Sequence, residues 1–514
     1  MSERLDPVTL SVLSSALSGA CEEMGAVLIR GAYSSNIKER KDCSTALFDE
    51  RGNMVAQAEH IPVHLGAMPE AVAAVMEKSP KPGDVFAVND PYSGGTHLPD
   101  ITLVSPMSHK RSIIGYAVTR AHHSDVGGMR PGSMPSDSRE IFQEGIIIPP
   151  VKLVENGDYV PDVLDILLAN VRTPGIRRGD LRAQIAANNV AEERVSELIE
   201  RRGEDTILAA FEEVVSYAER RVREAINSLP DGEHSAEDFL EGDGTTGDDI
   251  PVKATVRVSG DSMSVDFSGT SEAVRGNVNC PLAVTRSSCY FALRVLLPDD
   301  TPANAGTYAP LGIRTPEGSL VNAKKPSAVV AGNVETSNRI ADVVLAALSG
   351  FAPERIPAQG QGTMNNTIIG GASGESWTYY ETIGGGQGAS SRGRGPSGVH
   401  VGMSNTLNTP VESLELEYPM RVERYELRYG SGGEGEHRGG DGIVRSLRLL
   451  ENASLSLLTD RRKYAPKGAA GGDDGSPGRN FVNGEEVPSK ASVELGAGDL
   501  VTVETPGGGG YGSV

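Results

Sequence analysis

Apolar and polar positions alternate with two different periods along this chain, and each period predicts its own kind of element. Near the N-terminus apolar side chains recur at the spacing of a core-facing helix. They are Leu10, Leu13, Leu17, Cys21, Met24 and Leu28. Asp6 and Pro7 form the helix start, with a capping carboxylate and a proline at the first helical position.

The helical period returns at residues 181–228, where Gly203 is the expected break between two helices. Shorter helical patterns cover residues 69–77 and, in the second half of the chain, residues 339–348. A short apolar run at residues 85–88 predicts a buried strand. Helices and strands therefore share the first half of the chain.

Strand-like runs on either side of polar turns predict β-hairpins. Residues 45–49 and 54–56 flank a turn rich in Asp, Gly and Asn. Residues 101–105 and 113–119 flank the polar segment 108–111. We expect each pair to be antiparallel.

Past residue 231 strands and glycine turns dominate. Residues 252–258 and 263–267 alternate around Gly260 and Asp261, another hairpin pattern. We therefore expect an α+β fold, with hairpins and long helices in the N-terminal half and a β-rich, glycine-rich C-terminal half. The expected domains are 1–235 and 236–514, intimately packed against each other.

Composition narrows the classes of function. The 514-residue chain has a formal net charge of −21, and an acidic surface repels phosphate backbones, so no binding to nucleic acid or membrane is expected. Its four cysteines lack a Cys-x-x-Cys spacing, which fits a reducing compartment. We see neither a signal-peptide pattern nor a run near the roughly 20 apolar residues that span a bilayer, and expect a cytoplasmic protein.

Histidines gather in one part of the sequence. Six of the nine lie between positions 60 and 123, at His60, His64, His97, His109, His122 and His123. If the strands at 101–105 and 113–119 pair about a turn near 109–110, His97 lies opposite His122 and Asp100 lies within one turn of both. His109, in the polar turn, is expected at the surface.

Imidazole and carboxylate side chains together suit zinc, manganese or iron, and a partly open coordination shell lets such an ion activate water. The sequence thus predicts a divalent transition-metal site at one end of the hairpin, in the first domain. The alternative is that His97 and His122 are ordinary hydrogen-bonded residues at strand ends. Asp42, beside a strand that should be buried, is a further candidate ligand, with a solvated loop carboxylate as its alternative.

Familiar nucleotide and nucleophile motifs are missing. The sequence contains neither a P-loop nor a Gly-x-Ser-x-Gly elbow with plausible partners. The glycine run at residues 507–512 matches a dinucleotide fingerprint in letters only, because no helix follows it. The turn at 384–388 is expected to be a tight turn, or else to offer backbone N–H groups to an anion. Cys43 and Cys289 lie in apolar surroundings and are expected to be inert.

Nine stretches together resemble the hydantoinase B/oxoprolinase family and span nearly the whole chain. They are NDP (89–91), GGTHLPD (94–100), AHHSDVGG (121–128), GDLRAQ (179–184), DFSGT (266–270), RGNVNCP (275–281), AGNVETS (331–337), ETIGGGQG (381–388) and TPG (505–507). One departure is that Gly402 stands where the family often has a second histidine, after His400.

The resemblance implies a metal held by His97, Asp100 and His122, with Asp42 completing the shell. It also implies that His123 and Asp125 orient the ligands or carry a proton. A hydantoinase A-like companion subunit of actin-like fold would bind ATP and magnesium, so a hetero-oligomer is expected.

The implied reaction is ATP-dependent hydrolysis of a cyclic amide, such as hydantoin, N-methylhydantoin, 5-oxoproline or another lactam. Phosphorylating the ring carbonyl oxygen would make the ring carbon electrophilic, and activated water would then attack it. Two alternatives stay open. One is a subunit of an ATP-dependent ketone carboxylase, and the other is a noncatalytic scaffold for the ATP-binding subunit.

Overall fold

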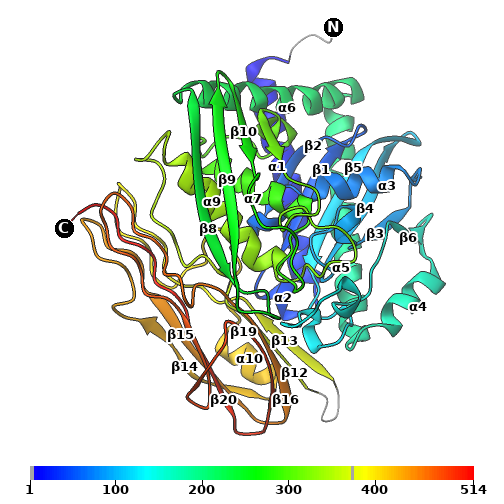
Figure 1. Ribbon diagram of the computed structural model, residues 1–514. Coiled ribbons are helices and arrows are strands. Elements are labelled where there is room, and N and C mark those ends of the chain that lie inside the picture. The colour runs from blue at the N-terminus through cyan, green and yellow to red at the C-terminus, as the bar shows by residue number, and fades with distance from the viewer. Residues whose placement is uncertain (1–4, 372–375, 514) are drawn as a thin grey trace.

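The computed structural model describes residues 5–371 and 376–513 and has the expected α+β architecture (Figure 1). A seven-stranded antiparallel sheet in order β2-β1-β5-β4-β3-β6-β7 organises the first half. Its strands are β1 (Cys43–Asp49), β2 (Met54–Glu59), β3 (Val85–Val88), β4 (Asp100–His109), β5 (Ser112–His122), β6 (Val151–Glu155) and β7 (Asp158–Tyr159). The predicted hairpins β1–β2 and β4–β5 are confirmed.

Both faces of this sheet are covered, and successive residues of β1 show how. Leu47 packs in one core cluster with α1 (Pro7–Gly31) and α5 (Pro174–Arg202). Its neighbours Ala46 and Phe48 point the other way, into a larger cluster with α3 (Met68–Met76), α7 (Leu282–Val295) and α9 (Ser337–Leu348). Every residue of β1 is buried as a result, because side chains alternate between two covered faces.

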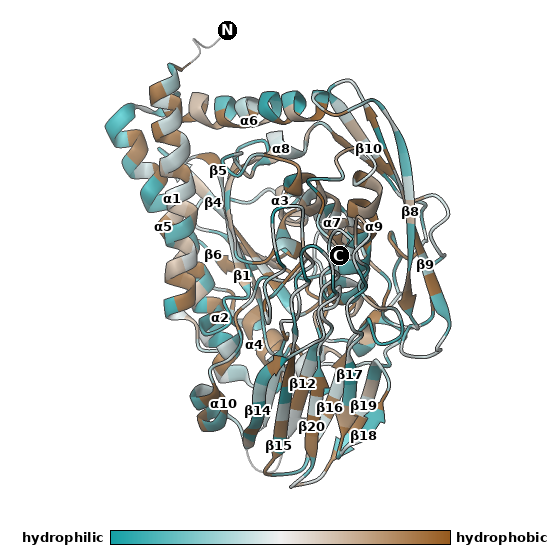
Figure 2. Ribbon diagram, turned by 90° about the vertical axis from the view of Figure 1, so that its left-hand side faces the viewer, coloured by the Kyte–Doolittle hydropathy of each residue, from teal (hydrophilic) through white to brown (hydrophobic). Residues whose placement is uncertain are grey.

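The long helices break and end close to where the sequence predicts, but the stretch predicted from residue 181 begins earlier, at Pro174. Asp6 caps α1 by accepting hydrogen bonds from the N–H groups of Val8 and Thr9. Gly203 separates α5 from α6 (Glu204–Asn227), with a φ of 87° that suits glycine. Figure 2 shows α1 and α5 side by side, with α6 crossing near one end. Helix α4 (Pro161–Ala169) and the single-turn α2 (Ser35–Lys38) complete the first half.

Helix α1 corrects one expectation. By length and apolarity it is a helix that could cross a membrane, the one found in the described part of the chain, with a mean hydropathy of 1.3. The sequence pattern had indicated no run of that kind. Its apolar face, including Leu13, Leu17 and Leu28, is buried in the cluster shared with α5 and β1, and that packing accounts for its composition.

Three further sheets follow. The first has the order β11-β10-β9-β8, the second β13-β12-β16-β19 and the third β14-β15-β20-β17-β18. The first comprises β8 (Gly232–Glu241), β9 (Asp249–Ser259), β10 (Ser262–Asp266) and β11 (Leu311–Arg314). The second comprises β12 (Asn366–Gly371), β13 (Trp377–Glu381), β16 (Ala453–Leu458) and β19 (Lys490–Leu495). The third comprises β14 (Met420–Arg428), β15 (Gly442–Leu449), β17 (Arg479–Val482), β18 (Glu485–Val487) and β20 (Leu500–Glu504).

The C-terminal half holds more helix than the one segment predicted at 339–348. That segment is α9, and α7 was missed, as were α8 (Ala305–Tyr308) and α10 (Val411–Glu417). The expected domain boundary near residue 235 falls inside β8. The largest core cluster contains residues from both sides of it, from Ala46 to Leu458. The division into two domains stays a prediction.

Candidate metal centre

The β4–β5 hairpin carries two of the candidate ligands on directly paired positions. Asp100 begins β4, His122 ends β5, and the two are register partners. The expected strand pairing, with His97 opposite His122, is wrong by three residues, because the register partner of His122 is Asp100. The turn is centred on Lys110 and Arg111, both with positive φ as a two-residue hairpin turn requires, and a bulge follows Met107.

His97 reaches the same place from the loop that precedes β4. Gly95 lets this loop fold tightly, because a Cβ there would lie 2.2 Å from the carbonyl oxygen of Asn89. The Asn89 side chain holds both flanks, donating to the Leu98 carbonyl at 2.7 Å and accepting from the Ile148 N–H at 2.6 Å. The loop therefore presents His97 to the end of the hairpin.

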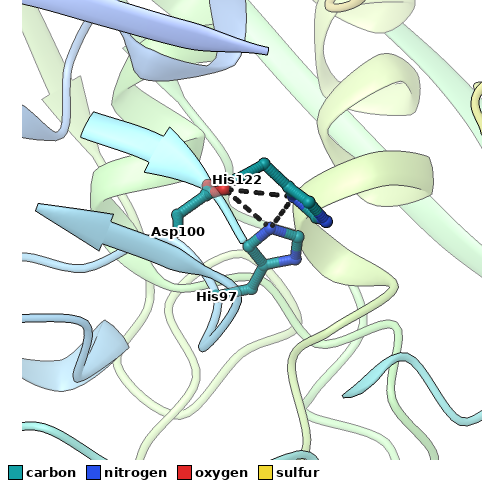
Figure 3. A group of neighbouring side chains, drawn as sticks. All are labelled: His97, Asp100 and His122. Carbon is teal, nitrogen blue, oxygen red and sulfur yellow. Dashed lines mark hydrogen bonds and ion pairs between the residues drawn. The ribbon is translucent and has the colours of Figure 1, made fainter. Parts of the chain in front are cut away.

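Three ligand atoms converge at this point (Figure 3). His97 Nε2 lies 3.1 Å from Asp100 Oδ1 and 3.2 Å from His122 Nδ1, and His122 Nδ1 lies 3.3 Å from the same carboxylate oxygen. We call His97, Asp100 and His122 the candidate centre. Each of these side chains is 3% exposed or less.

Surrounding residues fix how the candidate centre is oriented. His64 Nε2 lies 3.4 Å from Asp100 Oδ2, and His64 Nδ1 lies 2.9 Å from Ser44 Oγ. The Thr96 hydroxyl donates to the same Oδ2. On the other side the Tyr380 ring stacks on His122, with centroids 4.4 Å apart. Oδ2 of Asp100 is thus occupied by protein partners while Oδ1 faces the two imidazoles.

Sequence reasoning noted His64 in the histidine cluster but gave it no role, and it missed Tyr380. A signal for His64 was available, since it lies just before α3 in the same histidine-rich stretch. Tyr380 comes from β13, far along the chain. No local pattern predicts that this strand packs on the hairpin end.

The pKa shifts of Asp100 and His122 favour the forms in which these two side chains bind a metal. Burial, the largest influence, would raise the pKa of Asp100. His97 and hydrogen bonds from His122 and His64 nevertheless hold that pKa well below its usual range. Burial lowers the pKa of His122, which keeps the imidazole neutral. A carboxylate and neutral imidazoles are the states in which these side chains bind metals.

The three facing atoms are arranged as ligands of a cation rather than as hydrogen-bond partners of one another. If both facing nitrogens carried protons to donate to Oδ1, the two N–H groups would oppose each other across 3.2 Å. Ligands about 2.0–2.2 Å from one ion lie roughly 3 Å apart, close to the three separations seen here. Within the described residues these are the groups whose ligand atoms all lie within 4.8 Å of one another. The donor set suits a divalent transition metal.

Asp42 lies beside the candidate centre without joining that group. Its side chain is buried, and its backbone carbonyl accepts a hydrogen bond from the His122 N–H at 3.0 Å. Its charge also favours protonated His122, although burial is the stronger influence on that pKa. Asp42 as a fourth ligand stays a prediction.

The two predicted catalytic residues are placed differently. His123 Nε2 lies 3.0 Å from Gln184 Oε1 on α5, and burial, followed by Arg177, lowers the pKa of His123 to about 4. The Asp125 carboxylate accepts from the N–H groups of Gly127 and Gly132 and pairs with Arg172 at 2.9 Å. The structure does not bring either side chain to the three ligand atoms, and a catalytic role for them stays a prediction.

Other candidates from the sequence lie elsewhere. His109 is 20% exposed and lies 3.8 Å from Glu204. The backbone N–H groups of Gly385, Gly386 and Gln387 donate to main-chain carbonyls, so these three are not free for an anion. Gly402 has a φ of 64°, and a Cβ there would lie 2.8 Å from the side-chain oxygen of Asn338.

The four cysteines are free and buried. Burial, with a smaller contribution from Asp42, raises the pKa of the Cys43 thiol, and burial likewise raises that of Cys289. A thiol that resists ionisation is a poor nucleophile, as their apolar surroundings predicted.

Comparison with known proteins agrees with the resemblance seen in the sequence. Residues 6–514 match the family described as Hydantoinase B/oxoprolinase. The chain belongs to this family. The nine motifs and the hairpin that carries Asp100 and His122 are therefore features of a hydantoinase B/oxoprolinase member.

Two relatives and one solved structure illustrate the family. The chain is 39% identical to 5-oxoprolinase 1 of Arabidopsis thaliana, covering 99% of this chain and 42% of that protein. It is 36% identical to a putative D-/L-hydantoinase subunit, of the B type, from a Pseudomonas species, covering 99% and 90%. The ATP-dependent caprolactamase from Pseudomonas jessenii superposes with a TM-score of 0.93 at 31% identity, covering 99% and 92%. The chain thus spans about two fifths of the plant enzyme but most of the other two chains.

Proposed function

We propose that this chain supplies the ring-opening site of an ATP-dependent cyclic-amide hydrolase, centred on a divalent transition metal held by His97, Asp100 and His122. The observation that carries the proposal is the convergence of two imidazole nitrogens and one carboxylate oxygen within 3.3 Å of one another. Relatives named as a 5-oxoprolinase, a hydantoinase subunit and an ATP-dependent caprolactamase support the substrate class.

The assembly is part of the proposal. A relative named as one subunit of a hydantoinase implies a companion, and the plant 5-oxoprolinase is more than twice as long as the segment that this chain matches. This chain has no P-loop. We propose that a hydantoinase A-like partner binds ATP and magnesium in a cytoplasmic hetero-oligomer.

When bound, the metal would supply Lewis-acid chemistry, polarising the amide carbonyl and acidifying water. The protein's own residues orient the ligands and shield the site from water. His64 and Thr96 contact Asp100 Oδ2, so that Oδ1 stays directed toward His97 and His122, where the three residues would hold the ion. Tyr380 fixes the plane of His122 and, as an aromatic cover, helps to exclude water. A buried site of this kind strengthens every electrostatic interaction with a developing negative charge.

The test uses the chain co-expressed with its companion, comparing wild type with His97→Ala and His122→Ala. Bound metal is measured by elemental analysis. ATP hydrolysis is followed with hydantoins, 5-oxoproline and simple lactams, and with ketones plus bicarbonate. We expect both variants to lose metal and cyclic-amide-stimulated turnover while the complex still assembles. His109→Ala, which changes a histidine of the same hairpin outside the candidate centre, should retain both.

Each alternative has its own signature in that experiment. Stimulation only by a ketone with bicarbonate would move the metal site to a carboxylase. Full turnover by both ligand variants would make the chain a noncatalytic scaffold. If both variants retain bound metal, the ion is held by other residues.

A further inference from the structure

A buried arginine lies beside the candidate centre. Arg120 is on β5, two residues before His122 and on the same face of the strand, and its side chain is fully buried. Nε donates to the Thr102 hydroxyl at 2.7 Å and Nη2 donates to the Gly94 carbonyl at 2.8 Å, while Nη1 has no hydrogen-bond partner. Neither acceptor carries a charge. Because buried charges are ordinarily paired, this cation calls for an explanation.

Strand pairing places Arg120 next to the carboxylate of the candidate centre. Thr102 is the register partner of Arg120, as Asp100 is of His122, so Asp100 and Arg120 are diagonal neighbours on one face of the hairpin. Diagonal neighbours lie about 7–8 Å apart, within reach of long side chains. Burial lowers the pKa of Arg120 to about 10, and the charges of Asp100 and Glu70 oppose that shift. The guanidinium is therefore protonated at neutral pH, and its charge acts on Asp100.

The two imidazoles of the candidate centre lack a contact that strengthens metal ligands. A metal-binding histidine ordinarily donates its second ring N–H to an acceptor, which makes the ring a stronger donor to the ion. His97 Nδ1 and His122 Nε2, the nitrogens outside the convergence, have no hydrogen-bond partner among the described residues. His123, next in sequence but outside the candidate centre, does have such a contact, with Gln184. Both imidazoles of the centre would therefore be weak donors.

We propose that Arg120 keeps the candidate centre electron-poor, so that a cation there is held loosely and stays strongly electrophilic. Arg120 acts through the field of its charge rather than by contact. Like charges repel over several Å, and burial leaves that repulsion little screened by salt. The proposal rests on the proposed function, since an electrophilic ion is what the polarisation of an amide carbonyl requires.

A purely structural role for Arg120 makes the opposite prediction. Arg120 ties the loop that carries His97 to the hairpin, because it contacts Gly94 in that loop and Thr102 on β4. If these ties were its function, any replacement would loosen the ligands and weaken metal binding. If its charge is decisive, a neutral replacement strengthens metal binding. The sign of the change in affinity therefore separates the two roles.

A second carboxylate offsets the charge of Arg120. Glu70, in the first turn of α3, forms an ion pair with Arg286 of α7. Burial raises the pKa of Glu70, while the charges of Arg286 and Arg120 oppose that shift. Asp100, Arg120, Glu70 and Arg286 thus alternate in sign. The Glu70 side chain is 30% exposed, so this carboxylate can be changed with little disturbance of the core.

The affinity of the full chain for Zn²⁺, measured by competition with a chromophoric chelator, tests the proposal. Arg120→Gln removes the charge and keeps a hydrogen-bond donor, so Zn²⁺ should bind about tenfold more tightly than to wild type. Arg120→Lys keeps the charge but loses the fork of the guanidinium, and its affinity should stay within about threefold of wild type. Thr102→Val removes only the acceptor of Nε and should also stay within about threefold.

Glu70→Gln tests the same charge with the opposite sign, and it decides the question if Arg120→Gln does not fold. It leaves Arg120 less neutralised, so Zn²⁺ should bind about threefold more weakly than to wild type. Glu77→Gln is the matched control, since Glu77 is an exposed glutamate at the other end of α3. Its affinity should equal that of wild type.

Unchanged or weaker Zn²⁺ binding in Arg120→Gln would overturn the proposal and leave Arg120 a structural residue. Equal affinities in Glu70→Gln and Glu77→Gln would also contradict it. His97→Ala distinguishes this proposal from the proposed function. If His97→Ala loses Zn²⁺ but Arg120→Gln binds it no more tightly than wild type, only the role of Arg120 is wrong. If Zn²⁺ binding survives His97→Ala unchanged, the metal site itself is wrong.

Discussion

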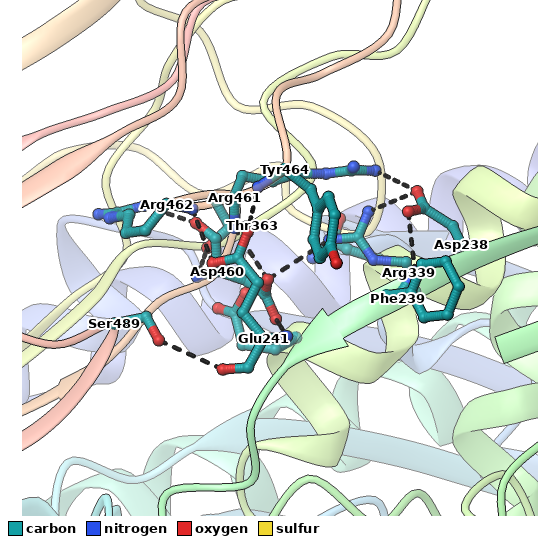
Figure 4. Close-up of polar contacts among 12 residues, drawn as sticks. Asp238, Phe239, Glu241, Arg339, Thr363, Asp460, Arg461, Arg462, Tyr464 and Ser489 are labelled. Atoms are coloured by element: carbon teal, nitrogen blue, oxygen red, sulfur yellow. Dashed lines mark hydrogen bonds and ion pairs between the residues drawn. The ribbon is translucent and has the colours of Figure 1, made fainter. Parts of the chain in front are cut away.

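Two buried polar groups in this molecule are built on opposite principles. In the candidate centre the three atoms that face one another are all of kinds that bind metals, two imidazole nitrogens and one carboxylate oxygen. A second group, which we call the ion cluster, alternates opposite charges and consists of Asp238, Arg339, Asp342, Asp460 and Arg461. Figure 4 labels Asp238, Arg339, Asp460 and Arg461 of this cluster. An added cation would complete the first, whereas the second contains its own cations.

The ion cluster satisfies itself at several contacts. Arg461 Nη2 lies 2.8 Å from Asp238 Oδ2 and 2.6 Å from Asp342 Oδ2. Arg339 Nη1 lies 3.1 Å from each of the same two oxygens. Lys490 adds a further cation 3.3 Å from Asp460. These residues come from β8, α9, the segment after β16, and β19, so the cluster joins distant parts of the chain.

This contrast distinguishes charged groups that stabilise the fold from charged groups that bind a ligand. Opposite charges that pair with each other indicate a structural role, because removing one leaves its partner buried and uncompensated. Acceptors that meet at one point indicate a binding role, because only an added cation completes them. Single substitutions in each group test whether the two differ in this way.

Removing a charge from the ion cluster should have the largest effect on stability. Arg461→Met leaves Asp238 and Asp342 with only Arg339 as a shared partner. We expect a loss of about 3–5 kcal/mol in the free energy of unfolding, as for other broken buried ion pairs, measured by denaturant unfolding. Bound metal per folded molecule should not change.

Arg424→Met provides the control for that variant. Arg424 pairs with Glu426 on the exposed side of β14, where both side chains are more than half exposed. Exposed pairs contribute little to stability, so this variant should unfold like wild type. A similar loss in both variants would mean that the ion cluster is no more structural than a surface pair.

At the candidate centre the corresponding change should act on affinity. His64→Ala removes the imidazole 3.4 Å from Asp100 Oδ2 and frees the carboxylate to rotate. Metal affinity should fall by about 10–100-fold, the usual effect of losing a residue that orients a ligand. Competition with a chromophoric chelator measures the affinity.

His60→Ala tests whether the loss of any histidine in this stretch would weaken metal binding. His60 packs against Gly25 of α1 and is not one of the three converging ligand residues, so its loss should leave the affinity for metal unchanged. His64→Gln, which restores a donor, should recover part of the loss. An unchanged affinity in His64→Ala would show that Asp100 needs no support from this residue.

Local patterns predicted most elements of the first half. Apolar periods and turn residues gave α1, the β1–β2 hairpin and the break at Gly203, because each depends on nearby residues. The same patterns missed α7, whose apolar and small residues carry no capping signal that stands out at its start. They also set the β4–β5 register three residues off, because neither the turn position nor the bulge after Met107 is visible in the pattern.

In the candidate site, too, residues that are close in sequence were predicted and residues from distant segments were missed. His97, Asp100 and His122 were predicted together because one hairpin and the loop before it carry them. Tyr380 comes from β13, a strand far along the chain that meets the hairpin only in the folded protein. His123 adjoins His122 in sequence, yet its side chain contacts α5 instead. Adjacency along a chain predicts where a backbone goes better than where a side chain points.

The smallest effect should come from pH, where the two groups respond with opposite sign. Burial, followed by the charge of Asp460, raises the pKa of Glu335 beside the ion cluster from an ordinary value of 4.5 to about 7. A raised folded-state pKa stabilises the fold below about 4.5, and that contribution is lost as pH rises through about 7. The lowered pKa of Asp100 works the other way, so its contribution is lost only as pH falls.

Glu335→Gln isolates the first of these contributions. Oε1 of Glu335 accepts from the Met364 N–H and the Asn366 amide, while Oε2 has no partner, so glutamine mimics the protonated acid. The variant should match wild type near pH 5 and exceed its stability by about 1–2 kcal/mol near pH 8. Unfolding curves at both pH values measure this. A constant difference at both would mean that Glu335 does not titrate there, and the falling stability of wild type would then need another source.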